Sequence, residues 1–406
     1  MIVASLNSQD YPEEFRDTKV KTAQIITNNI ETSIPIYRLN SRDFLSLEFD
    51  ILSPFQDNLF YAIELRDYNW EPLNESYDYW LNGNFFNFIS DFSFSSYSLT
   101  PYVHYRINFP NQNCQPLKSG NYLIKVFRET DTANLVFSKK FYVVSENVLV
   151  KTEFGVPYNG NLIVSDQKIN MQILATNIEN IIPENLKVDV WQNAVPINKA
   201  LDIPYQFYVN NTFSYDADRY LVFPGNREFN YIDLRNFKFK SFNVKELTNY
   251  KGMPFVILQP DLIQLNYLTN PLDLNGFYYI QSTEYINPVL EAAYAYVKFT
   301  FAPKNAELLK KQQVFIDGVL SYNGSCQSPQ MDYDSASNSF TKILLLKQGF
   351  YSYSYYIKNP DNNQTYFPVN FSDTENDYYI FVYYKYFDQR HYSLVGNSAI
   401  NSVKNN

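Results

Sequence analysis

The chain has 406 residues, a length that predicts about two to four domains. Hydrophobic residues make up 45% of it, which excludes wholesale disorder. The 33 Lys and Arg against 42 Asp and Glu give a net charge of −9. This charge disfavours nucleic acids and anionic lipid surfaces as main partners, because both attract basic proteins.

Alternation of apolar and polar residues predicts strands along most of the chain. Within Phe44–Ile51 the odd-numbered residues are apolar, whereas Ser46, Glu48 and Asp50 are polar. This pattern is typical of a strand with one face in a core and the other in water. Further strands are predicted, in chain order, at Phe60–Arg66, Tyr122–Phe127, Lys139–Val144, Val297–Phe301, Val314–Ile316, Phe340–Leu346, Tyr351–Tyr355 and Tyr379–Tyr386.

Turn signals such as Asn82-Gly83, Asn159-Gly160 and Asn323-Gly324 separate these runs, and only Lys304–Lys311 suggests a short helix. Short strands between frequent turns favour an all-β protein built from β-sandwiches. We expect an N-terminal extension over residues 1–17 and three tandem sandwiches over residues 18–146, 147–289 and 290–403, with less than about 10% helix against the usual third.

Catalytic motifs are scarce. Neither a phosphate-binding glycine loop nor a CxxC pair occurs, and His104 and His391 are the only histidines. His104 lies in an aromatic run and is expected to be a structural, partly packed histidine, whereas His391 lies in a predicted hairpin turn and is expected to be solvated. Cys114 and Cys326 are far apart in the sequence, and whether they pair stays open. We therefore expect no enzyme activity, no catalytic residue, no cofactor and no metal.

Acidic pairs and aromatic runs leave other sites open. The closest acidic groups are Asp216 with Asp218, Asp332 with Asp334, and Asp373 with Glu375 and Asp377. They could bind calcium through loop oxygens or form a glycosidase pair, although solvated turn acids are the favoured interpretation. Aromatic residues that could stack on sugars are Trp70, Trp80, Trp191 and Tyr351–Tyr356, for which core packing is favoured.

A series of short motifs has the order and spacing of a known family. They are Tyr68-Asn69-Trp70-Glu71-Pro72, Tyr79-Trp80-Leu81-Asn82-Gly83, Tyr102-Val103-His104-Tyr105, Asn108-Phe109-Pro110-Asn111, Ser119-Gly120-Asn121-Tyr122-Leu123, Trp191-Gln192-Asn193, Phe223-Pro224-Gly225-Asn226, Leu345–Tyr351 and Thr374–Tyr378. Together they resemble the plug protein of the Bacteroidota type IX secretion system, over roughly Lys19 to Asn401. The chain departs from the family at Glu64-Leu65-Arg66, where a His-Cys pair is usual, and at Arg227-Glu228-Phe229.

The resemblance implies a non-enzymatic protein on the periplasmic face of the outer membrane. Its partner would be the large translocon barrel, whose periplasmic opening the plug seals when no substrate passes. The residues that would bind the barrel are not identified by the motifs. The alternative is a carbohydrate-binding or glycan-processing sandwich protein.

The last block also resembles an early-set immunoglobulin-like fold, through Val297–Phe301, Val314–Gly318, Met331 and Leu344–Tyr353. Sugar-binding members carry a Trp after the Asp-Gly segment, where this chain has Ser321-Tyr322. The resemblance therefore implies the fold without the sugar site.

Three further features guide expectations for targeting and packing. No apolar window is long enough for a membrane-spanning helix. Met1 to Gln9 lack the pattern of a signal peptide, so the chain either stays in the cytoplasm or has lost its signal. Gly349 is expected to adopt a positive φ in a turn, and Trp70 and Trp191 are expected to be mostly buried.

Overall fold

The computed structural model describes residues 13–96, 100–194, 198–263, 270, 272–322, 328–358, 364–367 and 369–403. With 49% strand and 7% helix, it confirms the prediction of an all-β protein. The described helices are single turns: α1 (Asp218–Leu221), α2 (Pro288–Glu291), α3 (Ala306–Leu309) and the 3₁₀ segments η1 (Tyr77–Tyr79), η2 (Thr132–Asn134), η3 (Gly160–Leu162), η4 (Pro183–Asn185) and η5 (Val319–Tyr322).

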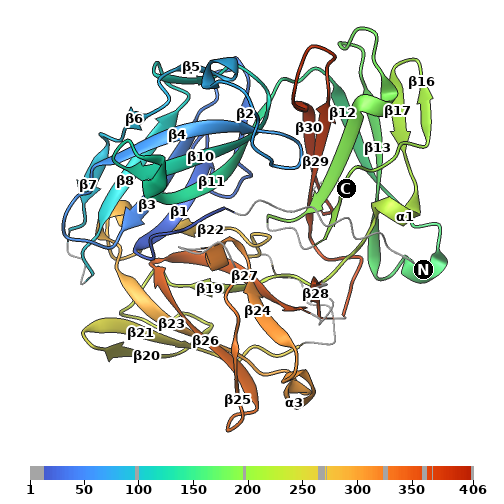
Figure 1. The fold of residues 1–406 in the computed structure, drawn as a ribbon. Helices are drawn as coiled ribbons and strands as arrows, with labels where there is room; N and C mark the ends of the chain where they lie inside the picture. Colours follow the sequence, from blue (N-terminus) through green and yellow to red (C-terminus); the bar gives the residue numbers. More distant parts are fainter. Residues whose placement is uncertain are drawn as a thin grey trace.

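A nine-stranded sheet runs through the upper half of the molecule (Figure 1). Its strands, in spatial order, are β15 (Lys199–Ala200), β14 (Leu186–Gln192), β29 (Asp377–Tyr384), β30 (Ser393–Asn401), β11 (Leu135–Val144), β10 (Gly120–Arg128), β4 (Leu59–Arg66) and β6 (Asn87–Phe88), with β2 (Ile36–Arg38) beside β11. The C-terminal hairpin β29–β30 therefore lies between strands from earlier parts of the chain, and its red arrows stand among green ones in Figure 1.

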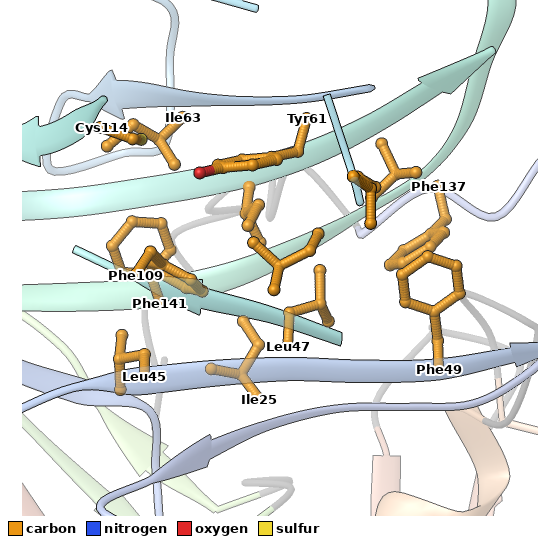
Figure 2. Close-up of a cluster of buried hydrophobic side chains, with 14 of the residues drawn as sticks. Ile25, Leu45, Leu47, Phe49, Tyr61, Ile63, Phe109, Cys114, Phe137 and Phe141 are labelled. Carbon is orange, nitrogen blue, oxygen red and sulfur yellow. The ribbon is translucent and has the colours of Figure 1, made fainter. Parts of the chain in front are cut away.

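The first core lies between one half of this sheet and a four-stranded sheet. That second sheet contains β1 (Val20–Thr27), β3 (Leu45–Ile51), β8 (Val103–Phe109) and β7 (Phe92–Phe94), and β5 (Leu81–Gly83) pairs with β9 (Cys114–Pro116) nearby. Figure 2 shows Leu45, Leu47 and Phe49 projecting from β3 towards Tyr61 and Ile63 of β4. The predicted alternation of β3 thus supplies one wall of this core.

The second core lies between the other half of the nine-stranded sheet and a five-stranded sheet. The latter contains β12 (Leu149–Gly155), β13 (Asp166–Leu174), β17 (Thr212–Tyr215) and β16 (Phe207–Val209), with β18 (Val222–Pro224) paired to β13. Tyr378, Ile380 and Val382 of β29 are fully or almost fully buried in this core. The last strands of the chain are thus part of its hydrophobic interior.

The third core lies between two five-stranded sheets. One contains β20 (Val244–Tyr250), β21 (Met253–Leu258), β23 (Tyr294–Phe301), β26 (Ser339–Lys347) and β25 (Asp332–Asp334). The other contains β19 (Asn230–Asp233), β27 (Gly349–Lys358), β22 (Tyr278–Ile280), β24 (Gln313–Asp317) and β28 (Gln364–Tyr366). Tyr351, Tyr353 and Tyr355 of β27 are buried in this core, which explains their alternation with serines.

A fourth, smaller cluster joins the regions around these cores. It combines Trp70, Tyr142 and Phe381 with Phe277, which precedes β22. The Trp70 and Tyr142 rings meet edge to face with centroids 5.6 Å apart, and Tyr142 lies 5.0 Å from Phe381. Segments from all parts of the chain therefore share one buried aromatic contact.

Strand pairing crosses the predicted boundary between residues 289 and 290. β29 and β30, expected in a third sandwich, line the second core, and β29 pairs with β14. β19 and β22, expected in a second sandwich, pair with β27. Alternation identifies a strand but does not identify its partner, which is why the sequence did not reveal this exchange. The number of domains and their immunoglobulin-like type stay predictions.

The polar side of β3 does not face water as expected. Asp50 is fully buried, because Tyr294 and Lys347 of the third-core region contact it, and Ser46 is also nearly buried. The sequence pattern located the first core correctly and missed the second contact surface of the same strand.

Gly349 has a role different from the one expected. It begins β27, and its φ is not in the left-handed region. A Cβ on Gly349 would lie 2.5 Å from the backbone oxygen of Tyr279 in the paired strand β22. Close approach of two backbones, rather than a positive φ, requires glycine here.

We therefore predict that Gly349→Ala lowers the free energy of unfolding by about 1–3 kcal/mol, as overpacking of a well-packed site does. Gly160→Ala is the matched control, because a Cβ on Gly160 would meet no atom within 4 Å. Denaturant unfolding of both variants tests this. Equal stability of the two variants would refute the backbone-contact explanation.

Candidate functional site

His104 lies in a buried cluster of charged side chains between β3 and β26. The Asp50 carboxylate accepts hydrogen bonds from Lys347 Nζ and from the Tyr294 hydroxyl, both at 2.7 Å. Its other oxygen lies 2.8 Å from His104 Nδ1, and Glu48 lies 3.6 Å from His104 Nε2. Burial lowers the pKa of His104, but its hydrogen bond to Asp50 and the nearby Glu48 carboxylate outweigh this and raise its pKa. These contacts agree with the expectation of a structural, packed histidine.

This cluster has the residue types of an active site without the access that a substrate needs. The side chains of Asp50 and Lys347 are 0% and 2% exposed. Lys347 Nζ also donates to the backbone oxygen of Val289 at 2.7 Å and lies 4.1 Å from the centre of the Tyr102 ring. The cluster as a whole joins β3 and β8 of the first core to β23, β26 and α2. The cluster is therefore a structural contact between the first-core and third-core regions.

His391 contradicts its prediction as a solvated turn residue. It is fully buried, with Nε2 3.0 Å from the Ser119 backbone oxygen and Nδ1 3.1 Å from the Tyr79 hydroxyl. Burial lowers its pKa. The hairpin that carries His391 packs against the first-core region, a tertiary contact that a local turn signal cannot reveal.

The three acidic groups do not form one site. Asp216 and Asp218 pair with Lys168 at 2.6 and 2.9 Å. Asp332 and Asp334 lie on the edge strand β25, where Asp332 is exposed and Asp334 is half-buried. In the third group, Asp377 accepts from Asn275 at 2.9 Å and from Asn401 at 2.7 Å, and Glu375 accepts from Asn401 at 2.9 Å, while Asp373 is exposed. Among the described residues, no group of three or more His, Cys, Asp and Glu is arranged to hold a metal ion.

The aromatic residues considered for sugar stacking are mostly interior. Trp70, Trp80 and four tyrosines of Tyr351–Tyr356 are buried, as expected for packing. Trp191 is half-buried, with its ring 4.6 Å from Phe381. A flat exposed row of rings is therefore not formed by these candidates.

Cys114 is a buried free thiol of the first core, and burial raises its pKa to about 12. Cys326 lies outside the described residues. No helix in the described part of the chain is long and apolar enough to cross a membrane.

Two surface hollows lie on the first-core region. One, of about 500 Å³, is lined by charged side chains that pair with one another, with Arg128 Nη2 2.8 Å from Asp57. The other, of about 560 Å³, has an apolar floor that includes Leu73, Trp80 and Phe86. The acids at its edge are also paired, since Glu75 lies 2.5 Å from Arg390.

Comparison with known families locates the resemblance in the first-core region. Residues 20–145 match the family model described as "Type 9 secretion system plug protein 1st domain". The match covers 126 of the 406 residues. The predicted resemblance is thus confirmed for β1 to β11, and the match ends directly after β11, beside β30 of the shared sheet.

A solved structure resembles nearly the whole chain. It is the crystal structure of a hypothetical protein from Parabacteroides merdae ATCC 43184, with a TM-score of 0.89 and 26% sequence identity. The match covers 96% of this chain and 98% of that one, so the two chains share the same overall fold. No curated protein matches this chain.

The Asp50–Lys347 pair generates a prediction about stability. Replacing either partner alone, as Asp50→Asn or Lys347→Met, should lower the free energy of unfolding by about 3–5 kcal/mol, because the remaining charge stays buried. The double variant should lose clearly less than the sum. Denaturant unfolding in a double-mutant cycle measures the coupling, and the exposed pair Asp332–Lys342, 3.6 Å apart, is the control with coupling below about 1 kcal/mol. Additive losses at the buried pair would show that Asp50 and Lys347 do not stabilise each other.

Asp261 generates a prediction about pH. It accepts hydrogen bonds from the Tyr353 and Tyr355 hydroxyls at 2.8 and 2.6 Å, and burial raises its pKa from 3.8 to about 6. The folded chain therefore holds this proton more tightly than the unfolded chain, so its contribution to stability is full below about pH 4 and is lost as the pH rises to about 6.

Through Asp261, the parent chain should lose about 3 kcal/mol of unfolding free energy between pH 4 and 6, since one pKa unit corresponds to about 1.4 kcal/mol. The Asp261→Asn variant should not show this decrease. Unfolding free energies across that range measure the slope. Asp332→Asn, at an exposed position, should leave the slope of the parent chain unchanged. An unaltered slope in the Asp261 variant would show that this carboxyl is not the titrating group.

Proposed function

We propose that this chain is a non-enzymatic plug of the type IX protein secretion translocon. It binds the periplasmic opening of the large outer-membrane barrel and seals it when no substrate is passing. The observation that carries the proposal is the match of residues 20–145 to the plug protein first domain. The location on the periplasmic face of the outer membrane follows from the same match.

The arrangement of the cores suits a stopper. A seal has to cover an opening and resist deformation, and close-packed sheets are rigid. The shared nine-stranded sheet and the buried Asp50–Lys347 pair hold the regions in one arrangement. These features support a mechanical role, and the plug-family match favours it over other roles for a rigid β protein.

The non-enzymatic part of the proposal rests on how the polar clusters are used. The Asp50 cluster is buried and out of reach of a substrate. Asp216 and Asp218 form ion pairs with Lys168. The carbohydrate alternative gains no support from the candidate aromatic residues, most of which are buried.

A stopper that is displaced in each secretion cycle should bind reversibly. We expect an interface of ordinary size, about 1,200–2,000 Å² in total, in which a few apolar anchors are surrounded by a polar rim. Loops that rigid sheets hold in place are suited to provide such anchors.

Deleting the gene tests the function. We predict that the barrel still assembles but that the outer membrane admits large solutes, and that the parent gene supplied in trans restores the seal. Uptake of a large fluorescent solute measures the leak, and the purified chain should bind the purified barrel. A deletion strain as tight as its parent, together with no binding to the barrel, would refute the plug function.

A further inference from the structure

The loop that joins β12 to β13, residues 156–164, presents apolar side chains to solvent. Val156, Tyr158, Ile163 and Val164 are each between 45% and 75% exposed. No charged residue occurs from Phe154 to Ser165, in a chain that otherwise carries 33 basic and 42 acidic residues. Apolar side chains grouped in this way on a surface mark an interaction site more often than single exposed ones do.

Lys168, Asp216 and Asp218 form an ionic clamp that contacts this loop, and only Lys168 is buried in it. The Lys168 side chain is 1% exposed, and its Nζ lies 2.6 Å from Asp216 and 2.9 Å from Asp218. The same Nζ lies 3.4 Å from the centre of the Tyr158 ring. Asp218 in turn accepts from the backbone N–H of Tyr158 at 2.6 Å and of Asn159 at 3.3 Å, and Asp216 accepts from the Tyr158 hydroxyl.

Burial lowers the pKa of Lys168, but its hydrogen bonds to the two aspartates outweigh this and raise it. The ammonium therefore stays charged at neutral pH. A positive charge under the Tyr158 ring is attracted to the face of that ring. The clamp thus fixes the position of a side chain that lies mainly in solvent.

The C-terminal end of the loop is also held, by backbone hydrogen bonds. The backbone oxygen of Val164 accepts from Ser372 at 3.1 Å, and that of Ser165 accepts from Gly225 at 2.9 Å. Between these ends, Asn159 caps η3 by accepting from the Asn161 N–H. Since both ends and the middle are bonded, little conformational freedom is left to lose on binding, which favours affinity.

We propose that the 156–164 loop is a preformed anchor for a protein partner and inserts into an apolar, uncharged recess with a polar edge. The acidic groups that contact or directly follow the loop, Asp166, Asp216 and Asp218, would form part of the matching rim, as in protein interfaces with an apolar centre. The assignment of this recess to the periplasmic side of the barrel rests on the proposed function.

The charge around the loop favours a protein over a lipid surface. Lys168 pairs with Asp216 and Asp218, no Lys or Arg occurs from Phe154 to Ser165, and the chain as a whole carries −9. Anionic headgroups are attracted by clusters of Lys and Arg, which this loop lacks. Four apolar side chains are also fewer than a standard interface needs, so the loop would be the centre of a larger contact.

The test measures binding of the full chain to the purified barrel in detergent. Tyr158→Ala and Val164→Asp should each weaken binding at least tenfold. Phe242→Ala and Leu308→Asp are matched controls in the third-core region, because Phe242 and Leu308 are 87% and 78% exposed and lie outside the loop and its rim, and they should bind like the parent. Melting temperatures of all four variants check that they fold.

The outcomes separate the two proposals. If the parent binds the barrel and both loop variants bind equally well, the loop is not the anchor and the plug function stands. If the parent does not bind the barrel, both proposals fail. A parallel arm uses phosphatidylcholine vesicles: binding of the parent that Val164→Asp abolishes would assign the loop to the membrane and overturn the protein partner.

Discussion

The structure depends on one sheet that belongs to two cores. Strands of the first-core region form one half of it, and β14, β15, β29 and β30 form the other. The two halves meet where Val144 of β11 pairs with Leu394 of β30, and Asn147 donates to the backbone oxygen of Val395 at 2.7 Å. Because backbone hydrogen bonds are directional, this junction fixes the relative position of the two cores. The end of the chain thus completes a core begun more than two hundred residues earlier.

The third-core region is attached to this sheet by contacts of a different kind. Its Phe277 packs into the aromatic cluster on the sheet, and Lys347 reaches the buried Asp50 of β3. A buried ion pair contributes little net stability compared with apolar residues of similar volume, since both charges lose their hydration. Its geometry is nevertheless strict, because any displacement leaves a charge without its partner. We infer that the pair selects one arrangement of the regions more than it strengthens the contact.

Period-two patterns predicted the strands well, because side chains alternate between the two faces of any strand. The runs at Phe44–Ile51, Phe60–Arg66 and Tyr379–Tyr386 correspond to β3, β4 and β29 within a few residues. The pattern could not tell what covers a face: Asp50 has the spacing of a solvated residue and is fully buried. His391 was missed for the same reason, since its burial depends on a surface far away in the sequence. For the 156–164 loop, a charge-free run was visible in the sequence, but its exposure and its clamp were not.

Rigidity connects the fold to the proposed plug. In a chain whose cores share a sheet and whose regions are joined by buried charges, partial unfolding of one region would expose the cores or charges of its neighbour. Opening the barrel by deforming the plug would therefore require a large free energy. Removing the plug as one body breaks only the contact with the barrel. The free energy needed for release would then be set by the interface alone. A small number of preformed apolar anchors fits this requirement, because such anchors give specific binding without the large buried area of a permanent complex.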